Sequence, residues 1–146
     1  MDKFITIGPM FHVNFCESGI KYSLGIEISY WAGRNDNLLG LNLGFDKLIS
    51  KSEPFVLYSE FQVLLPSSNM HKGFFNGLSI GPNLSISHNP HIGIQGSVWA
   101  EYLLGADLRF KHLNNASYFS FGAFGKCPVW SNTIWYSDRN RSEFLD

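Results

Sequence analysis

The sequence predicts an all-β protein, an antiparallel up-and-down β-barrel of about eight strands. Long stretches alternate apolar residues with small or polar ones, which is the period-two pattern of strands with two different faces. Motifs of the first half return in the second half, which divides the chain into two sets of about four strands. No stretch shows a helical period. Two four-stranded repeats would form one sheet, closed or nearly so.

The repeated motifs come in the same order in both halves. Ile7-Gly8-Pro9 returns as Ile80-Gly81-Pro82, and Trp31-Ala32 returns as Trp99-Ala100. The stretch 38–48 returns as 103–113, and 58–61 has a looser echo in 121–124. If the halves are equivalent, Trp31 and Trp99 lie at matching rims, and alternate residues from 39 to 45 face the same way as those from 104 to 110.

Each predicted strand is bounded by turn or loop residues. Alternation runs unbroken from 91 to 111, which is one long strand or, as the repeat predicts, two strands joined near Ala100-Glu101-Tyr102. The barrel domain is expected over 1–128, followed by a polar C-terminal tail over 129–146 in which 129–136 is the reserve candidate for a last strand. The expected strands are 3–15, 20–31, 38–46, 55–64, 75–87, the two within 91–111, and 117–127.

Composition narrows the class of protein. The chain has 146 residues, enough for one domain, and a formal net charge of −1, which argues against a nucleic-acid binder. Charged residues are 16% and aromatic residues also 16%, so the outside is not expected to lie wholly in water. No stretch reaches the ~18 continuous apolar residues of a membrane-spanning helix. The N-terminus has no signal-peptide pattern, so the chain is cytosolic or a mature form.

The face opposite the apolar one decides which side of the barrel is inside. A soluble barrel would place many charged residues on that face, but here it carries mainly glycine and serine, which suit a narrow barrel interior. The apolar face carries no charge in any expected strand and is rich in aromatic residues toward the strand ends. The predicted lumen charges have mixed signs and form a candidate network: Lys21, Glu27, Glu60, Glu101, Asp107 and Arg109.

In this pattern the chain from Lys3 to Cys127 resembles the small outer-membrane β-barrel proteins of Gram-negative bacteria. The resemblance implies a lipid bilayer or detergent around the barrel, a bacterial outer-membrane location with the signal peptide removed, and a non-enzymatic structural or interaction role. Pro9 and Pro82 depart from it, because each removes a hydrogen-bond donor in mid-strand. The alternative is a soluble lipocalin-like barrel, cytoplasmic or secreted, with its apolar face inward around an apolar ligand.

No motif for catalysis, a cofactor or a metal is present. The five histidines are scattered without metal-ligand spacing, and no residue matches the serine and histidine motif of rim-sited lipid hydrolases. A lumen network is a simpler reading of the acidic residues than an acid–base site. Cys16 and Cys127 are expected at opposite rims as free thiols, and no protein or nucleic-acid partner is indicated.

Overall fold

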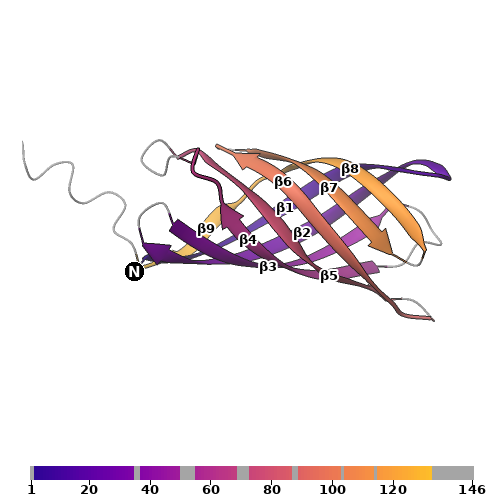
Figure 1. The fold of residues 1–146 in the computed structure, drawn as a ribbon, viewed down its shortest axis with the longest axis horizontal. Helices are drawn as coiled ribbons and strands as arrows, with labels where there is room; N and C mark the ends of the chain where they lie inside the picture. The colour runs from indigo at the N-terminus through magenta and orange to yellow at the C-terminus, as the bar shows by residue number, and fades with distance from the viewer. Residues whose placement is uncertain are drawn as a thin grey trace, which may run out of the picture.

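The computed structural model describes residues 2–34, 37–49, 55–68, 73–86, 89–102, 104–113 and 115–132. These residues form a closed antiparallel barrel of eight strands and one additional strand (Figure 1). Within them, no helix is long and apolar enough to cross a membrane. The strands are β1 (Asp2–Cys16), β2 (Gly19–Arg34), β3 (Asn37–Leu48), β4 (Phe55–Leu64), β5 (Phe75–Ile86), β6 (His91–Glu101), β7 (Gly105–Leu113), β8 (Ala116–Phe124) and β9 (Cys127–Ser131).

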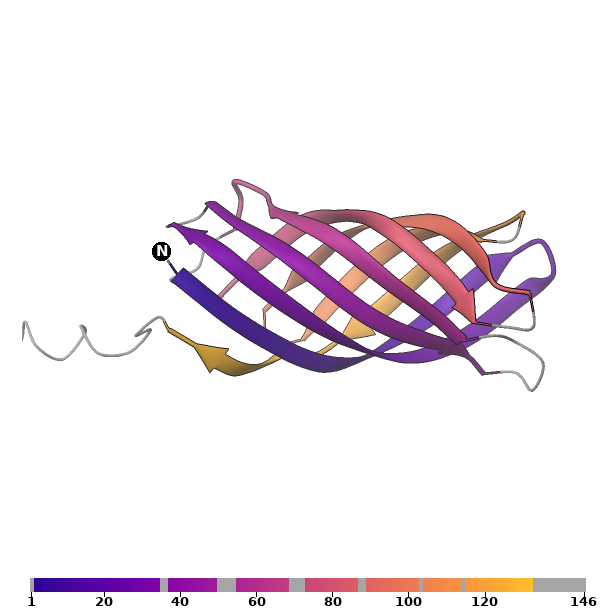
Figure 2. The ribbon, with the colours of Figure 1, turned by 90° about the horizontal axis from the view of Figure 1, so that it is seen from below.

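Each strand pairs with the next along the chain, and β1 closes the barrel. One edge of β1 pairs with β2 over its whole length, and the other edge pairs with β9 over residues 4–7 and with β8 over residues 10–15. Following paired residues around the barrel from Phe4 leads back to β1 at Asn14, ten residues further on. Such an offset requires strands tilted by roughly 35–45° to the axis. Figure 2 shows this slant.

The two ends of the barrel are named here by the residues they carry. The N-terminal rim holds the start of β1 and the chain reversal between β6 and β7, and β9 lies at the same end (Figures 1 and 2). The distal rim holds the two-residue turn Glu17-Ser18 between β1 and β2.

The predicted strands are confirmed, with small differences at their ends. The chain reverses between Glu101 and Gly105, so the stretch 91–111 is two strands, as the repeat predicts. Pairing with β1 continues through β9 to Ser131, three residues beyond the predicted domain boundary at 128. A bulge opposite Ile5 and Thr6 breaks the period of β9, which explains why alternation does not reveal it.

The two glycine–proline pairs lie where strand pairing is interrupted. Opposite Gly8-Pro9, β1 changes its partner from β8 to β9, and the pairing of β4 with β5 skips Gly81-Pro82. Proline cannot donate to the ladder, so these interruptions accommodate it. The carbonyl oxygens of Gly125 and Ser59 occupy the space that a Cβ would take at Gly8 and Gly81, which explains the glycines.

The apolar face of the barrel is outside and the polar face is inside, as predicted. Outward leucine, isoleucine and phenylalanine side chains of every barrel strand are exposed, while the alternate residues are buried in the lumen. The buried polar and charged residues in the strands are Thr6, His12, Asn14, Ser23, Glu27, Ser29, Asn42, Asp46, Glu60, Gln62, Ser79, Asn83, Ser85, Gln95, Ser97, Asp107, Arg109, Lys111 and Ser120.

Candidate functional site

The candidate site is the polar lumen, where residues far apart in sequence meet. Strand alternation brings every second residue inward, and the tilt of the strands sets which of them share a level of the barrel. The central contacts come from β1, β2, β4 and β7.

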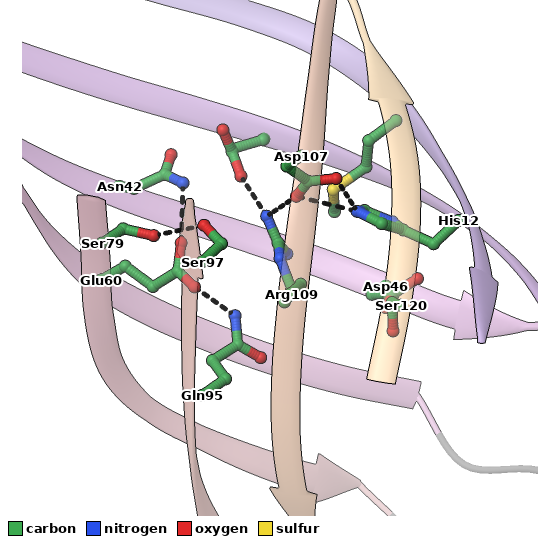
Figure 3. Close-up of polar contacts among 12 residues, drawn as sticks. His12, Asn42, Asp46, Glu60, Ser79, Gln95, Ser97, Asp107, Arg109 and Ser120 are labelled. Carbon is green, nitrogen blue, oxygen red and sulfur yellow. Dashed lines mark hydrogen bonds and ion pairs between the residues drawn. The ribbon is translucent and has the colours of Figure 1, made fainter. Parts of the chain in front are cut away.

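A charge cluster surrounds Arg109 of β7. Its Nη2 atom lies 3.0 Å from Asp107 Oδ2 and 3.6 Å from Glu27 Oε2. His12 Nε2 lies 3.0 Å from the other oxygen of Asp107, so Asp107 stands between His12 and Arg109 (Figure 3). The Arg109 guanidinium also lies 5.0 Å from the ring centre of Tyr58, whose hydroxyl donates to Glu27 at 2.8 Å. These charges are buried but paired, which is how a protein interior accommodates ions.

Lys126 is a second cation of this cluster. Its Nζ atom lies 2.6 Å from Glu27 Oε1 and donates to Ser29 Oγ at 2.9 Å. The same ammonium group lies over the rings of Trp99 and Phe124, at 5.7 and 5.3 Å from their centres. The sequence reasoning missed Lys126. The inward phase of Ser120, Gly122 and Phe124 continues to position 126 and would have found it.

Two further polar groups fill the lumen beside the Arg109 cluster. Lys111 forms an ion pair with Asp46 across the barrel. Glu60 accepts hydrogen bonds from the amide of Gln95 at 2.7 Å and from that of Asn42 at 3.3 Å (Figure 3). The side chain of Glu60 is fully buried, and these two amide donors satisfy its oxygens.

The structure brings together only part of the predicted network. Glu27, Asp107 and Arg109 are in contact, and Glu60 lies in the same lumen with amide partners. Glu101 is half-buried at the end of β6, at the N-terminal rim. Lys21 is half-buried near the distal rim, so these two residues lie at opposite ends of the barrel.

The sequence reasoning also missed an aromatic cluster inside the N-terminal rim. Trp31, Leu38 and Trp99 form a buried core, and the two indole rings meet edge to face with centres 5.8 Å apart. The half-buried residues that pack against this core are Phe4, Leu64, Phe75 and Phe124. These seven residues, the aromatic cluster below, lie on the inward face, so this end of the lumen is filled by apolar side chains.

Little room for a ligand remains between these groups. A cavity of about 10 Å³ lies between the Arg109 cluster and the aromatic cluster. In the described part of the chain, no group of three His, Cys, Asp or Glu side chains is placed to hold a metal ion. Cys16, beside the distal turn, and Cys127, which begins β9, are free thiols.

The chain was compared with known proteins at three levels. No protein-family model and no curated protein matches it. The solved structure of Neisserial surface protein A (NspA) matches 86% of this chain and 97% of its own, at 12% identity and a TM-score of 0.55. Ail, the attachment invasion locus protein of Yersinia pestis, matches the same shares at 10% identity and a TM-score of 0.42. The match to NspA confirms the resemblance to small outer-membrane β-barrels at the level of the fold.

Proposed function

We propose that this chain spans a bacterial outer membrane as a non-enzymatic barrel with a structural or interaction role. The observation that carries the proposal is the distribution of side chains, which is apolar on the outside of every barrel strand and polar inside. Lipid covers such an outer face without cost, and closure of the sheet satisfies its backbone groups in the bilayer.

The soluble alternative requires an apolar interior large enough for a ligand. The structure instead turns the apolar face outward and packs charged and amide side chains in the middle of the lumen. The apolar side chains inside the N-terminal rim pack against one another. A soluble barrel of this kind would also expose an apolar surface far larger than monomeric proteins tolerate in water. These observations favour the membrane protein.

Refolding with and without a membrane mimic tests the proposal. The denatured chain should fold when diluted into detergent micelles or lipid vesicles, and it should aggregate in plain buffer. Strand content by circular dichroism and a heat-dependent shift in gel mobility would report folding. A monodisperse, folded protein in plain buffer would contradict the membrane location.

An arginine substitution tests which part of the outer face lies in the bilayer. Ile26 is outward-facing at the centre of β2, and Ile20 is outward-facing near its distal end. Ile26→Arg should lower the free energy of unfolding by about 2–4 kcal/mol, whereas Ile20→Arg should cost about 0–1 kcal/mol. Equal costs for the two variants, measured by denaturant titration in lipid, would mean that no bilayer surrounds β2.

We also propose that the lumen is closed to ions. Paired charges fill its middle and the aromatic cluster fills its N-terminal end, as expected in a barrel of only about eight strands. Recording from a planar bilayer containing pure protein should show no steady conductance. A large and stable ionic current would contradict closure without contradicting membrane insertion.

A further inference from the structure

The cavity beside Arg109 is large enough to hold a water molecule. Its volume of about 10 Å³ is the space that the centre of a water-sized sphere can reach, so at least one water fits inside. Its polar lining comes from several strands around the barrel, and four of the lining side chains matter here: His12 of β1, Gln62 of β4, Trp99 of β6 and Arg109 of β7. The cavity therefore lies on the axis of the barrel, at the boundary between the Arg109 cluster and the aromatic cluster.

Each of these four side chains carries a buried polar atom without a hydrogen-bond partner among the described residues. The atoms are His12 Nδ1, Gln62 Oε1, Trp99 Nε1, and Nε and Nη1 of Arg109. All four residues are at most 5% exposed, so bulk water does not reach them. Leaving a buried polar group unpaired destabilises the folded state, and the coincidence of several such groups around one cavity therefore indicates a ligand.

The donors and acceptors around the cavity match those of water. Trp99 Nε1 and one of the two unpartnered nitrogens of Arg109 donate to it, and Gln62 Oε1 accepts from it. His12 holds Asp107 through Nε2, and in the tautomer that donates this hydrogen bond its Nδ1 atom is an acceptor. Two donors and two acceptors are the full complement of a water molecule.

We propose that a single internal water molecule binds in this cavity as a permanent part of the structure. It accepts hydrogen bonds from the Trp99 indole and the Arg109 guanidinium, and it donates to Gln62 Oε1 and His12 Nδ1. A cation is disfavoured because Arg109 and Lys126 line the cavity, and an anion is disfavoured because the carboxylates of Glu27 and Asp107 line it as well. The proposal does not depend on a membrane location.

This water lies between the charge cluster and the aromatic cluster and forms hydrogen bonds with both. Trp99 belongs to the aromatic cluster and Arg109 to the charge cluster, and no hydrogen bond between the two side chains is described. Through the water, the indole N–H of Trp99 gains a route to the polar lumen. Gln62 orients this water, because its side-chain oxygen accepts one of the water's hydrogen bonds.

Nuclear magnetic resonance of the full, 15N-labelled chain in detergent micelles tests the proposal. Cross-relaxation spectra should show a dipolar cross-peak between the Trp99 indole proton and water, with the sign of a water bound for longer than nanoseconds. Trp130 of β9 is 48% exposed and is the control, for which only exchange or short-lived hydration is expected. Absence of a dipolar cross-peak at Trp99 would overturn the proposal, whatever the behaviour of the variants.

A pair of glutamine variants locates the site. Gln62→Leu removes the acceptor and should abolish the cross-peak at Trp99. Gln95→Leu removes a buried amide of the same lumen that does not line the cavity, and the cross-peak should persist. Heat-dependent gel mobility verifies that each variant is folded. A cross-peak that survives in folded Gln62→Leu at its original intensity would contradict the proposed geometry.

Discussion

Strands β1–β4 place Glu27, Asp46 and Glu60 in the lumen, whereas strands β5–β8 place Arg109 and Lys111 there. Asp107 of β7 is the exception among the buried charges, since it stands beside Arg109 on the same strand. Near the two rims, half-buried Lys21 of β2 and Glu101 of β6 also depart from this division. The first half of the barrel is thus the acidic wall and the second half the basic wall. Ion pairs that cross the lumen therefore join the two halves, which also meet along β4–β5, at β1, in the Gln95–Glu60 hydrogen bond and in the contact of Trp31 with Trp99.

The backbones of the two halves are more alike than their charges. Pro9 pairs with Ile26 in the first hairpin, and Pro82 pairs with Ile94 in the corresponding hairpin of the second half. These residues stand in the same place relative to the repeated motifs, and each proline lies at an interruption of the ladder on its other side. The repeat read from the sequence is therefore visible in the register of these hairpins.

The likeness weakens along each half. Trp31 pairs with Gly40, whose counterpart in the repeat is Gly105. Trp99 instead pairs with Asp107, two residues further along β7. A shift of two residues leaves every side chain on its original face. The predicted correspondence between residues 58–61 and residues 121–124 is wrong. Tyr58 points into the lumen at 4% exposure, whereas Phe121 points outward at 53%.

Equivalent residues of the two halves meet in the lumen. Trp31 contacts Trp99, and Asp46 contacts Lys111, its counterpart in the repeat of 38–48 in 103–113. This is the result expected of two similar halves facing each other across the barrel axis. Identical charges would repel at such a position, so the difference between Asp46 and Lys111 is what allows the two walls to bind each other.

The largest effect is expected from breaking the ion pair between the halves. Lys111→Met leaves the Asp46 carboxylate buried without its cation and should lower the free energy of unfolding by about 3–5 kcal/mol. The exposed Lys47 of β3 gives a matched control. Its ammonium group lies over the ring of Phe55, and Lys47→Met should cost about 1 kcal/mol or less. Denaturant titration in micelles measures both.

The exchanged pair sharpens the comparison. If positions 46 and 111 are equivalent, the double variant Asp46→Lys with Lys111→Asp restores the ion pair and recovers most of the stability lost in Lys111→Met. A double variant no more stable than Lys111→Met would show that the two walls are not interchangeable at this level.

A smaller effect is expected at the two interruptions of the ladder. Gly8→Ala and Gly81→Ala each drive a methyl group into a backbone carbonyl, and each should cost about 1–3 kcal/mol. Gly125→Ala is the control, since the nearest atom to its Cβ would be a leucine methyl at 3.5 Å. Similar costs at Gly8 and Gly81, measured by thermal unfolding, would support equivalence of the two sites, and a cost at one site alone would contradict it.

Most of the fold was predictable because one face of each barrel strand is mainly apolar. Alternation places a side chain correctly wherever the strand keeps its phase, and the reversal near Glu101 followed from the repeat. The segment after Lys126 was not predictable, because Pro128 and the bulge beside it break the period. The repeat gave a wrong match at Tyr58. Tyr58 and Phe121 are both aromatic, but Tyr58 points into the lumen and Phe121 points outward.

The membership of the lumen was more predictable than its contacts. The alternation of inward and outward residues is enough to place Glu27, Asp107 and Arg109 in the lumen. Their contacts with one another depend on the ten-residue offset of the closed sheet, which no local sequence pattern reveals. Lys21 and Glu101 share the same face and yet lie at opposite rims. The aromatic cluster was overlooked because Trp31 and Trp99 interrupt a face that otherwise carries small residues.

The smallest expected effect is the direct coupling of Trp31 and Trp99. Their edge-to-face contact at 5.8 Å joins the two halves at the N-terminal rim, and such aromatic pairs contribute about 0.5–1.5 kcal/mol beyond the area they bury. Trp31→Leu, Trp99→Leu and the double variant form a cycle in which the pairwise term separates from the loss of packing. We expect the double variant to be more stable than the sum of the single losses predicts, by that amount. Strict additivity would mean that each indole packs only against its own half, and the halves would then be joined in the lumen by ion pairs and hydrogen bonds alone.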